Sequence, residues 1–303
     1  MANAREILDR MKSIQDTMKI TNAMYMISSS KLRKARKMEE DAEAHFYASR
    51  QALDDVLKHV PEIEHVYIAD EKDENISEPR KAFIVVTADK GLAGAYNHNI
   101  IKMALEDIEK TKNYHLFVVG KIGRDFFEKH NMKIERNFKY TIQNPSIGRA
   151  RIIAETVLEH YLNGEFDEVY IVFTEMLNVM QSEVKTAKLL PINRPKAGEE
   201  SSLKEDTEYV PSVEAVIDSI VPNLVTGFLY GALVEAYSSE QNSRMVAMKS
   251  STENAGEMLK ELGIEYNRVR QAAITQEITE VVAGAKAQQS KRKKQLKDGG
   301  AGN

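Results

Sequence analysis

The sequence predicts an α/β protein in which a long antiparallel two-helix coiled coil, formed by the N- and C-terminal segments, carries an inserted Rossmann-like α/β domain. Two observations predict this architecture. Seams with coiled-coil spacing occupy both ends of the chain, and apolar runs of strand length alternate with helical patterns between them. We expect residues 1–60 and 211–303 to form the coiled coil, 61–80 an acidic connector, and 81–210 the globular domain.

The C-terminal segment from Ser238 to Ala285 contains no proline, and its apolar or small residues recur at alternating spacings of three and four. This spacing is typical of a long helix that lies along a partner helix. The seam is rich in Ser, Thr, Ala and Gln, which indicates that the partner approaches closely. Its members are Val234, Ser238, Gln241, Met245, Met248, Thr252, Ala255, Leu259, Leu262, Tyr266, Val269 and Ala273.

The N-terminal segment predicts the partner helix. No proline or glycine interrupts residues 2–60, and Pro61 marks the expected end. At 1.5 Å per residue such a helix is roughly 85 Å long, too long for the core of an ordinary globular domain. Its period of 3.5 predicts a left-handed supercoil. The seam comprises Ile7, Met11, Ile14, Met18, Thr21, Tyr25, Ser28, Leu32, Ala35, Glu39, Ala42, Phe46, Ser49, Leu53, Val56 and Val60.

The two predicted helices differ in length. Ser212 is a candidate N-cap, and Pro222 is expected to break or kink the helix before the long run to beyond Ala287. Because both helices start at the same domain, the C-terminal one should outrun its partner by up to about 20 residues. The overhang should begin near Gln271, and its apolar residues have no mate within the chain; they are Ile274, Ile278, Val281 and Val282.

The middle of the chain predicts a mostly parallel, doubly wound sheet. Continuous apolar runs at Ala82–Thr87, His115–Gly120 and Glu168–Phe173 indicate strands buried on both faces. The alternating pattern of Val179–Leu190 predicts a strand that returns antiparallel. Helices are expected between the strands, at Asn99–Lys110, around Lys121–Lys129 and at Ile147–Leu162. Residues 196–208 should form an exposed loop.

Composition limits the functional classes. The 303 residues are 42% hydrophobic and include no cysteine, which excludes disulfides, a thiol nucleophile and a cysteine metal site. The longest apolar run is far shorter than a membrane span, and the N-terminus lacks the apolar region of a signal peptide. We therefore expect a protein of the cytoplasm without a direct membrane span.

Charge is distributed unevenly behind a net charge of −4. Residues 1–37 carry nine Lys/Arg and three Asp/Glu, a balance of +6, whereas residues 38–80 carry four and thirteen, a balance of −9. This uneven charge has two possible interpretations. The charges solvate a long helix, or the basic end of the helix faces an acidic partner.

Catalytic motifs are absent from the sequence. The Thr87–Asn97 loop follows a buried strand, but its Gly91-x-x-Gly94 matches neither a dinucleotide-binding nor a P-loop motif, and a tight turn explains its glycines better. Asp89 and Lys90 are expected to form a surface ion pair rather than an acid–base pair. The seven histidines show no ligand spacing, so we expect no metal and no cofactor.

The basic run Lys291–Lys294 near the C-terminus has no interleaved aromatic residues, and the chain as a whole is acidic. We interpret it as a solvated helix end and expect no nucleic-acid partner.

Three motifs resemble one family, the gamma subunit of bacterial F-type ATP synthase. Ile14–Ala35 (IQDTMKITNAMYMISSSKLRKA) resembles that family's N-terminal signature, and Ser243–Ala285 resembles its C-terminal signature nearly residue for residue. Asp89–Gly94 (DKGLAG) is similar to the family's Asp-Arg-Gly-Leu-Cys-Gly and departs from it at Lys90 and Ala93. The resemblance covers the chain in order, except residues 61–80, 196–208 and the tail after Ala287.

The resemblance implies a central rotor without a catalytic site or cofactor. Its coiled coil would penetrate a hexamer of alpha and beta subunits, and its globular end would sit with epsilon on the membrane ring of c subunits. The subunit would lie peripherally on the cytoplasmic face of the cell membrane. Either protons or sodium would be the coupling ion.

The resemblance also implies which residues of the coiled coil contact the alpha and beta subunits. Those carried over from the family are Met24, Arg270, Gln271, Thr275 and Glu277. The basic residues Lys19, Lys31, Arg33 and Arg36 are candidates to face an acidic lever on beta. The apolar candidates Ile274, Ile278 and Val281 come from the predicted overhang.

Two other classes remain open on the residues alone. An enzyme with a dinucleotide-binding domain would bind NAD or ATP in a titration of the isolated protein. A free-standing coiled-coil scaffold would be complete alone, whereas a rotor should co-purify with alpha and beta subunits in unequal stoichiometry.

Overall fold

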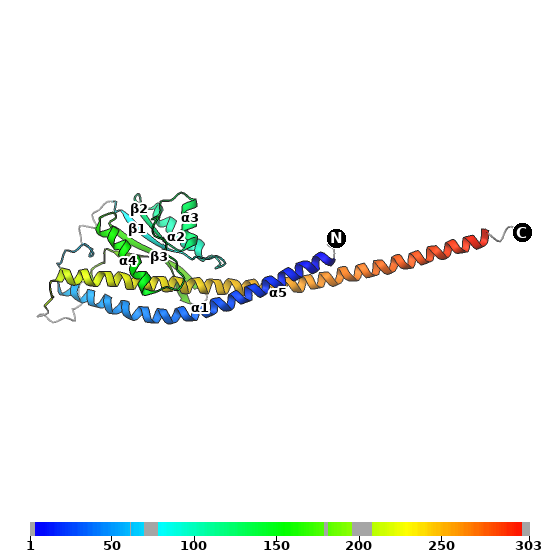
Figure 1. The fold of residues 1–303 in the computed structure, drawn as a ribbon, viewed down its shortest axis with the longest axis horizontal. Coiled ribbons are helices and arrows are strands. Elements are labelled where there is room, and N and C mark those ends of the chain that lie inside the picture. Colours follow the sequence, from blue (N-terminus) through cyan, green and yellow to red (C-terminus); the bar gives the residue numbers. More distant parts are fainter. Residues whose placement is uncertain (1–3, 61, 70–77, 179–180, 196–207, 299–303) are drawn as a thin grey trace. The chain divides into compact units, whose positions relative to one another are not determined.

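A computed structural model describes residues 4–60, 62–69, 78–178, 181–195 and 208–298, without the side chains of 39–45, 48 and 292–298. Two long helices begin and end the described chain: α1 (Ala4–His59) and α5 (Val213–Asp298). All strands and the three shorter helices lie between them in sequence (Figure 1). The predicted fold class, a pair of long terminal helices with an inserted α/β domain, is confirmed.

The inserted domain contains a mixed four-stranded sheet of order β2-β1-β3-β4. The central strand β1 (Lys81–Val86) pairs in parallel with β2 (Tyr114–Val119) on one side and with β3 (Glu168–Asn178) on the other. Strand β4 (Gln181–Leu190) returns antiparallel to β3, as its alternating pattern predicted. Strand β3 extends to Asn178, beyond the predicted end at Phe173, because the hairpin with β4 supplies backbone partners there.

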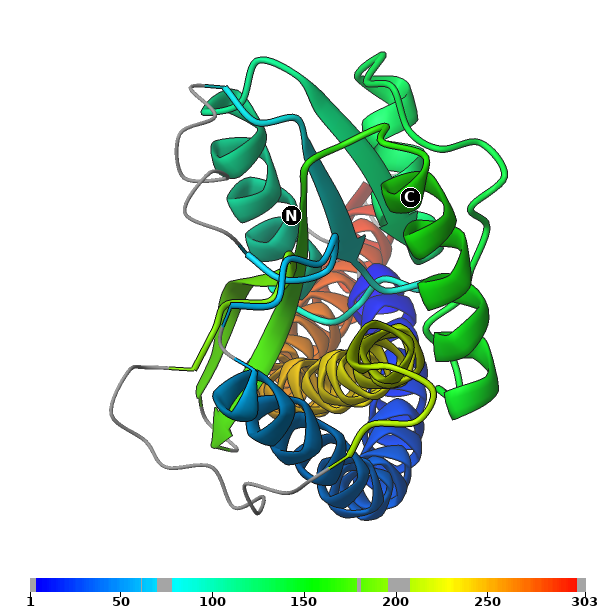
Figure 2. The same cartoon turned by 90° about the vertical axis from the view of Figure 1, so that its left-hand side faces the viewer.

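Helices cover both faces of the sheet, which is why the strands are apolar on both sides (Figure 2). Helix α2 (Tyr96–Glu109) and Phe127 of α3 (Lys121–Lys129) pack on the face that carries Phe83 and Val85. Helix α4 (Ile147–Leu162) packs on the opposite face with Ile84, and so do the domain-proximal parts of α1 and α5. The predicted bounds of α3 and α4 match those observed.

The chain divides into two compact units, and α1 and α5 each contribute to both. Unit 1 comprises residues 1–23 and 248–303, and unit 2 comprises residues 24–247. Unit 1 is a pair of helices: Ile7 lies on α1, Ala255 and Leu262 lie on α5, and all three are buried. The helices run antiparallel, since Thr21 meets Thr252 and Met11 lies against Gly263.

A polar layer lies within the helix pair of unit 1. The hydroxyls of Thr21 and Thr252 are 2.8 Å apart, and Thr252 also donates to the Met248 carbonyl. Both side chains are half-buried. A single polar pair in an otherwise apolar seam favours one register of the two helices over others.

The predicted seams agree with the burial along both helices where side chains are described. All described members are buried or half-buried except Ala273, which is exposed. Ala273 was assigned wrongly because the seam ends with Val269, where α5 loses its partner helix. The side chains of Glu39 and Ala42 lie outside the described residues.

Of the two expected effects of Pro222, a break or a kink, the break is wrong. The helix begins at Val213, where the Ser212 hydroxyl accepts from the Ala215 amide at 3.2 Å, and it continues through Pro222 without interruption. An internal proline costs about 3 kcal/mol. Burial of Ile217 and Val221 beside it offsets that cost.

Helix α5 also contains an 18-residue window with a mean hydropathy of 1.4, long and apolar enough by composition to cross a membrane. Half of that window is buried inside the protein. The domain-proximal part of α5 supplies many residues to the core beneath the sheet, which accounts for its apolar composition.

The start of β1 is held by Arg80 and Asp167. The Asp167 carboxylate accepts from the Arg80 backbone amide at 2.8 Å and from its guanidinium at 2.6 and 3.1 Å. These hydrogen bonds hold the pKa of Asp167 below its usual range. Their stabilisation is therefore present above the unfolded-state pKa and is lost as the pH falls through the lower folded-state value.

We expect Asp167→Asn to lower the free energy of unfolding by roughly 2 kcal/mol at pH 7. The difference from wild type should shrink as the pH falls through the lowered folded-state pKa of Asp167, below which the aspartate is protonated in both states. Denaturant unfolding across this pH range measures both quantities. A penalty that stayed constant with pH would mean that the charge of Asp167 does not stabilise this junction.

Two glycines allow α3 to approach the end of β1. A Cβ on Gly120, whose φ is +91°, would stand 2.1 Å from the Thr87 carbonyl oxygen, and one on Gly123 would stand 2.6 Å from the Thr87 hydroxyl. The same hydroxyl donates to the Val119 carbonyl and accepts from the Gly123 amide. A side chain at position 120 must displace the Thr87 backbone, and one at position 123 must displace the side chains of Thr87 and Val118.

We expect Gly120→Ala to destabilise the protein by on the order of 3 kcal/mol, through the clash and the strained φ. The matched control is Gly148→Ala in α4, where a Cβ meets nothing within 4 Å. That change should be neutral or stabilising by about 0.5–1 kcal/mol. Thermal unfolding of the two variants compares them, and equal effects would contradict the close approach at Thr87.

Candidate interaction surface

The end of α5 has no partner within the described chain. Every side chain from Arg270 to Lys291 is exposed, whereas Val269 is still half-buried. The helix nevertheless continues to Asp298, about 40 Å beyond Gln271. The overhang therefore begins where the sequence predicted.

Apolar side chains are exposed along this overhang. Ile274, Ile278, Val281 and Val282 are between 47% and 68% exposed. The candidate Thr275 donates to the Gln271 carbonyl at 2.9 Å, and its neighbour Thr279 donates to the Thr275 carbonyl at 2.7 Å, both within the helix. Arg270 and Glu277 are exposed. Helices in proteins gain most of their stability from packing of an apolar face, so a partner surface would stabilise this overhang.

The candidate residues on α1 differ in exposure. Lys19 is exposed and pairs with Asp16 at 3.0 Å, a contact of little energetic weight. Arg33 and Arg36 are exposed, whereas Met24 and Lys31 are half-buried. Buried Ser28, Leu32 and Ala35 interleave with these residues and face the seam. The basic stretch therefore presents Arg33 and Arg36 outward and keeps Lys31 close to the core.

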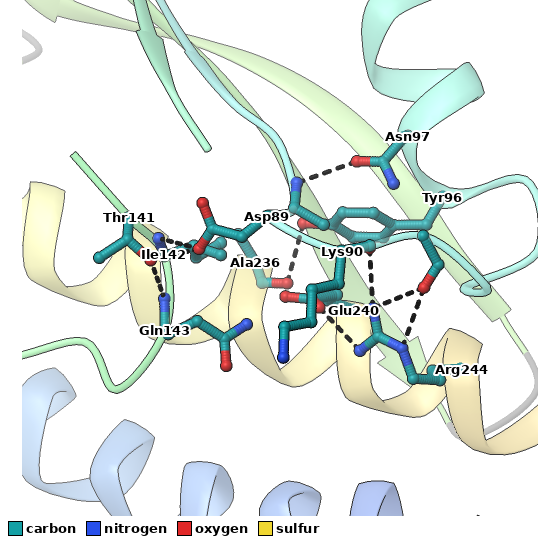
Figure 3. Close-up of polar contacts among 12 residues, drawn as sticks. Asp89, Lys90, Tyr96, Asn97, Thr141, Ile142, Gln143, Ala236, Glu240 and Arg244 are labelled. Atoms are coloured by element: carbon teal, nitrogen blue, oxygen red, sulfur yellow. Dashed lines mark hydrogen bonds and ion pairs between the residues drawn. The ribbon is translucent and has the colours of Figure 1, made fainter. Parts of the chain in front are cut away.

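The Asp89–Gly94 loop is fixed from two sides (Figure 3). The Asp89 carboxylate accepts from the backbone amides of Lys121 and Ile142 at 3.0 and 3.1 Å and from the Thr141 hydroxyl. It thus joins the loop after β1 to the start of α3 and to the loop between α3 and α4. The expectation that Asp89 forms a surface ion pair with Lys90 is wrong. The carboxylate oxygens of Asp89 instead accept from the Lys121 and Ile142 amides and the Thr141 hydroxyl.

Arg244 of α5 holds the other side of the loop. Its guanidinium donates to the carbonyls of Lys90 and Gly91 at 3.0 and 3.1 Å, and lies 2.7 Å from the Glu240 carboxylate (Figure 3). The Glu240 side chain is fully buried and that of Arg244 is 8% exposed. Burial raises the pKa of Glu240, and the positive charge of Arg244 opposes this shift.

Tyr96, at the start of α2, completes this cluster. Its hydroxyl donates to the Ala236 carbonyl at 2.9 Å, and burial together with the Glu240 charge raises the pKa of Tyr96 well above its ordinary value. The loop, α2 and α5 are therefore joined by buried hydrogen bonds.

The buried ion pair of Glu240 and Arg244, which holds the Asp89–Gly94 loop, was not predicted from the sequence. A signal was present: residues Ser238–Asn242 form an unbroken polar run in a helix, and all five are buried. Five consecutive buried residues require packing on every side of the helix. Heptad spacing selects only the side of the helix that faces α1, and of these five residues that side includes only Ser238 and Gln241.

No cluster of three or more His, Asp or Glu side chains in the described residues is arranged to hold a metal ion. The site is thus defined by exposed apolar and basic side chains on long helices and by a firmly held loop. These features are typical of an interaction protein.

The comparisons with known proteins identify the class. Residues 3–288 match the family model described as ATP synthase. The gamma chain of ATP synthase from Acetivibrio thermocellus is 44% identical over 297 residues, covering 95% of this chain and 99% of that protein. A gamma chain described as sodium ion specific, from Acetobacterium woodii, is 36% identical and covers 94% and 98% of the two chains.

Solved structures share the fold at low sequence identity. A chain of the mitochondrial ATP synthase from Euglena gracilis aligns with a TM-score of 0.66 and 16% identity, covering 95% of both chains. The protein belongs to the ATP synthase gamma chain family.

Proposed function

We propose that this chain is the central rotor subunit of an ion-translocating ATP synthase and that it couples ion flow to ATP synthesis or hydrolysis without a catalytic site of its own. Family membership and the unpartnered apolar overhang of α5 support this role. One relative is named as sodium ion specific and others carry no such qualification, so both coupling ions remain in the proposal.

The proposed partners are a hexamer of alpha and beta subunits around the overhang, the epsilon subunit, and the membrane c-ring. Arg270, Gln271, Thr275 and Glu277 would contribute polar contacts to the hexamer, with Ile274, Ile278 and Val281 in an apolar bearing. The complex would place this subunit peripherally on the cytoplasmic face of the cell membrane.

The basic residues of α1 are proposed to face an acidic lever on beta. Lys19, Arg33 and Arg36 are exposed and suited to long-range attraction. Lys31 is half-buried, and its charge adds a minor opposition to the rise that burial causes in the pKa of Glu240. We therefore assign Lys31 a smaller share of the contact than its two arginine neighbours.

The mechanism is mechanical. Rotation of an asymmetric shaft would bias each beta site among conformations with different nucleotide affinities. Because such coupling between sites is reciprocal, nucleotide hydrolysis can drive the shaft in the opposite direction.

Co-purification tests this assembly. An affinity tag on this chain in its native host should recover alpha and beta subunits in excess over the tagged chain, as native mass spectrometry can count. Recovery of the tagged chain alone, or with one partner in equal amount, would favour a free-standing scaffold. Micromolar binding of ATP or NAD to the isolated chain, measured by calorimetry, would favour a nucleotide-binding enzyme.

Met24→Lys is expected to impair coupling more than assembly. The half-buried Met24 would receive a charge without a described partner, which costs several kcal/mol if the site is covered. We expect the ions pumped per ATP hydrolysed to fall severalfold while the subunit composition is retained. The matched control, Asn22→Lys, adds the same charge at an exposed position of α1. Normal pumping by the Met24 variant would contradict the contact.

A further inference from the structure

A concavity of about 930 Å³ is lined by the end of α3 and the loop that follows it, at residues 128–139. The function proposed above makes no use of it. Residues 121–140 carry six Lys/Arg and three Asp/Glu, a balance of +3 in a chain whose net charge is −4. Three exposed cations in the lining, Lys133, Arg136 and Lys139, form what we call the basic rim.

The loop that carries the basic rim is held along β2, the edge strand of the sheet. The Glu135 amide donates to the Leu116 carbonyl at 2.9 Å, and the Gly120 amide donates to the Tyr140 carbonyl at 2.9 Å. The loop therefore covers the outer edge of β2 and has a defined backbone path. A partner would meet the rim cations in fixed positions, which lowers the entropy cost of binding.

Buried side chains of the same loop direct the rim cations outward. Met132 and Ile134 pack against the core on one face of the sheet, and Phe138, which is 1% exposed, belongs to the core on the other face. The loop thus wraps around the edge of β2 with its apolar side chains inward. The cations of the basic rim alternate with them and face solvent.

The acidic residues of the lining do not neutralise the basic rim. The Glu135 side chain is 22% exposed, and its carboxylate accepts from the Asn137 amide at 3.2 Å and lies 3.5 Å from the His115 imidazole. Glu128 is exposed, but its neighbour Lys129 is exposed as well. The outward side of the loop is therefore positively charged.

The rim cations also lack carboxylate partners. In the described part of the chain none of the three forms an ion pair. Exposed lysines elsewhere in the same unit do so: Lys102 pairs with Glu106, Lys110 with Asp107, and Lys112 with Glu78. An anionic partner could bind the basic rim without breaking an internal ion pair.

The lining favours a protein segment over other polyanions. Half-buried Met132 and Ile134 offer apolar contact between the cations. No aromatic side chain is part of the described lining, so it cannot stack nucleic-acid bases. A lipid surface is flat and would leave the centre of the concavity uncovered.

We propose that the basic rim binds an acidic segment of a partner protein. Carboxylates of that segment pair with Lys133, Arg136 and Lys139, and an apolar side chain between them contacts Met132 and Ile134. The guanidinium of Arg136 can hold one carboxylate through two parallel hydrogen bonds. This contact goes beyond the rotor role, because it lies on the α/β domain and uses no residue of the overhang.

The test titrates the full-length chain, labelled with ¹⁵N and deuterated, with a synthetic peptide of repeated Glu-Glu-Leu while the amide spectrum is recorded. Saturable shifts should be confined to the amides of residues 128–140. Raising the ionic strength from about 0.05 M to about 0.2 M should weaken binding severalfold. A peptide of repeated Gln-Gln-Leu, which has the same shape without the charges, should produce no saturable shifts.

Three variants test the assignment to the basic rim. Lys133→Glu combined with Arg136→Glu reverses two charges and should weaken binding at least about tenfold. Arg136→Lys keeps the charge but loses the planar fork and should weaken binding about threefold. The matched control Arg151→Glu reverses an exposed charge on α4 and should leave binding unchanged.

Four results would each overturn the proposal. The first is shifts confined to the basic tail after residue 288, and the second is equal binding of the Gln-Gln-Leu peptide. The third is an equal loss of binding in Arg151→Glu, which would indicate unspecific attraction. The fourth comes from a parallel titration with phosphatidylglycerol vesicles: rim-dependent binding of vesicles without binding of the peptide would assign the basic rim to a membrane surface.

Discussion

Ending the chain at Ala272 will weaken assembly of the ATP synthase complex by at least about a hundredfold, whereas removing residues 289–303 will leave coupled activity near normal. The longer deletion removes Ile274, Ile278, Val281 and Val282, which are roughly half exposed in this chain. Covering each would contribute about 1 kcal/mol, or about 4 kcal/mol in total. The shorter deletion removes only residues beyond the matched family region, which ends at 288.

Assembly is measured as the fraction of this chain that co-migrates with the complex over a range of subunit concentrations, and coupling as ions pumped per ATP hydrolysed. Severe loss from the short deletion would assign the contact to the basic tail instead of the apolar overhang. Full activity after the long deletion would mean that the overhang makes no bearing contact.

Arg244→Met will destabilise the protein by about 3–5 kcal/mol, because it leaves Glu240 buried without its partner. Because a methionine side chain has a volume similar to that of arginine, the loss of stability measures the charge and hydrogen bonds of Arg244 and not a cavity. The groups around Glu240 in the cluster are Asp89, Lys31, Tyr96 and Tyr237. Of these only Lys31 is positive, and it is half-buried on α1.

The pH dependence of the Arg244 variant has a defined sign. The pKa of Glu240 is higher in the folded state than in the unfolded state. Its contribution to the free energy of unfolding is therefore fully present below the unfolded-state pKa and is lost as the pH rises through the folded-state pKa. Removing Arg244 removes the interaction that opposes this shift. The penalty of the variant should therefore be smaller at pH 5 than at pH 8.

Two further variants separate charge burial from general damage. Glu240→Gln in the Arg244→Met background should restore much of the lost stability. Lys249→Met on the same helix breaks an exposed i,i+4 pair with Glu253 and should change stability by less than about 0.5 kcal/mol. A penalty of similar size for Lys249→Met, or no recovery with Glu240→Gln, would contradict a role for the buried pair.

The sequence was sufficient for features that depend on periodic burial. The strands, the three inserted helices and the antiparallel return of β4 follow from apolar spacing, and the start of the overhang follows from the difference in length between the two terminal helices. Lys121–Lys129 and Ile147–Leu162 match to the residue because glycine or serine precedes each helix and supplies its N-cap.

Features that depend on tertiary packing could not be predicted. The rule that proline breaks a helix considers the local backbone alone. It does not include the burial of neighbours such as Ile217 and Val221, which allows Pro222 to remain inside α5. Glu240 and Arg244 look like an ordinary surface pair at i,i+4 spacing until the Lys90–Gly91 carbonyls are placed against them. The basic rim likewise requires the loop at residues 128–139 to be held along β2.

Direct observation of rotation tests the central proposal. The alpha–beta assembly would be fixed to a surface, and a gold rod would be attached to this chain through a cysteine introduced at exposed Lys133, since the sequence has no native cysteine. We predict that saturating ATP produces sustained rotation of the rod in one direction, and that the chain ended at Ala272 produces less torque. ATP hydrolysis by assembled complexes whose rods remain stationary would contradict the rotor role.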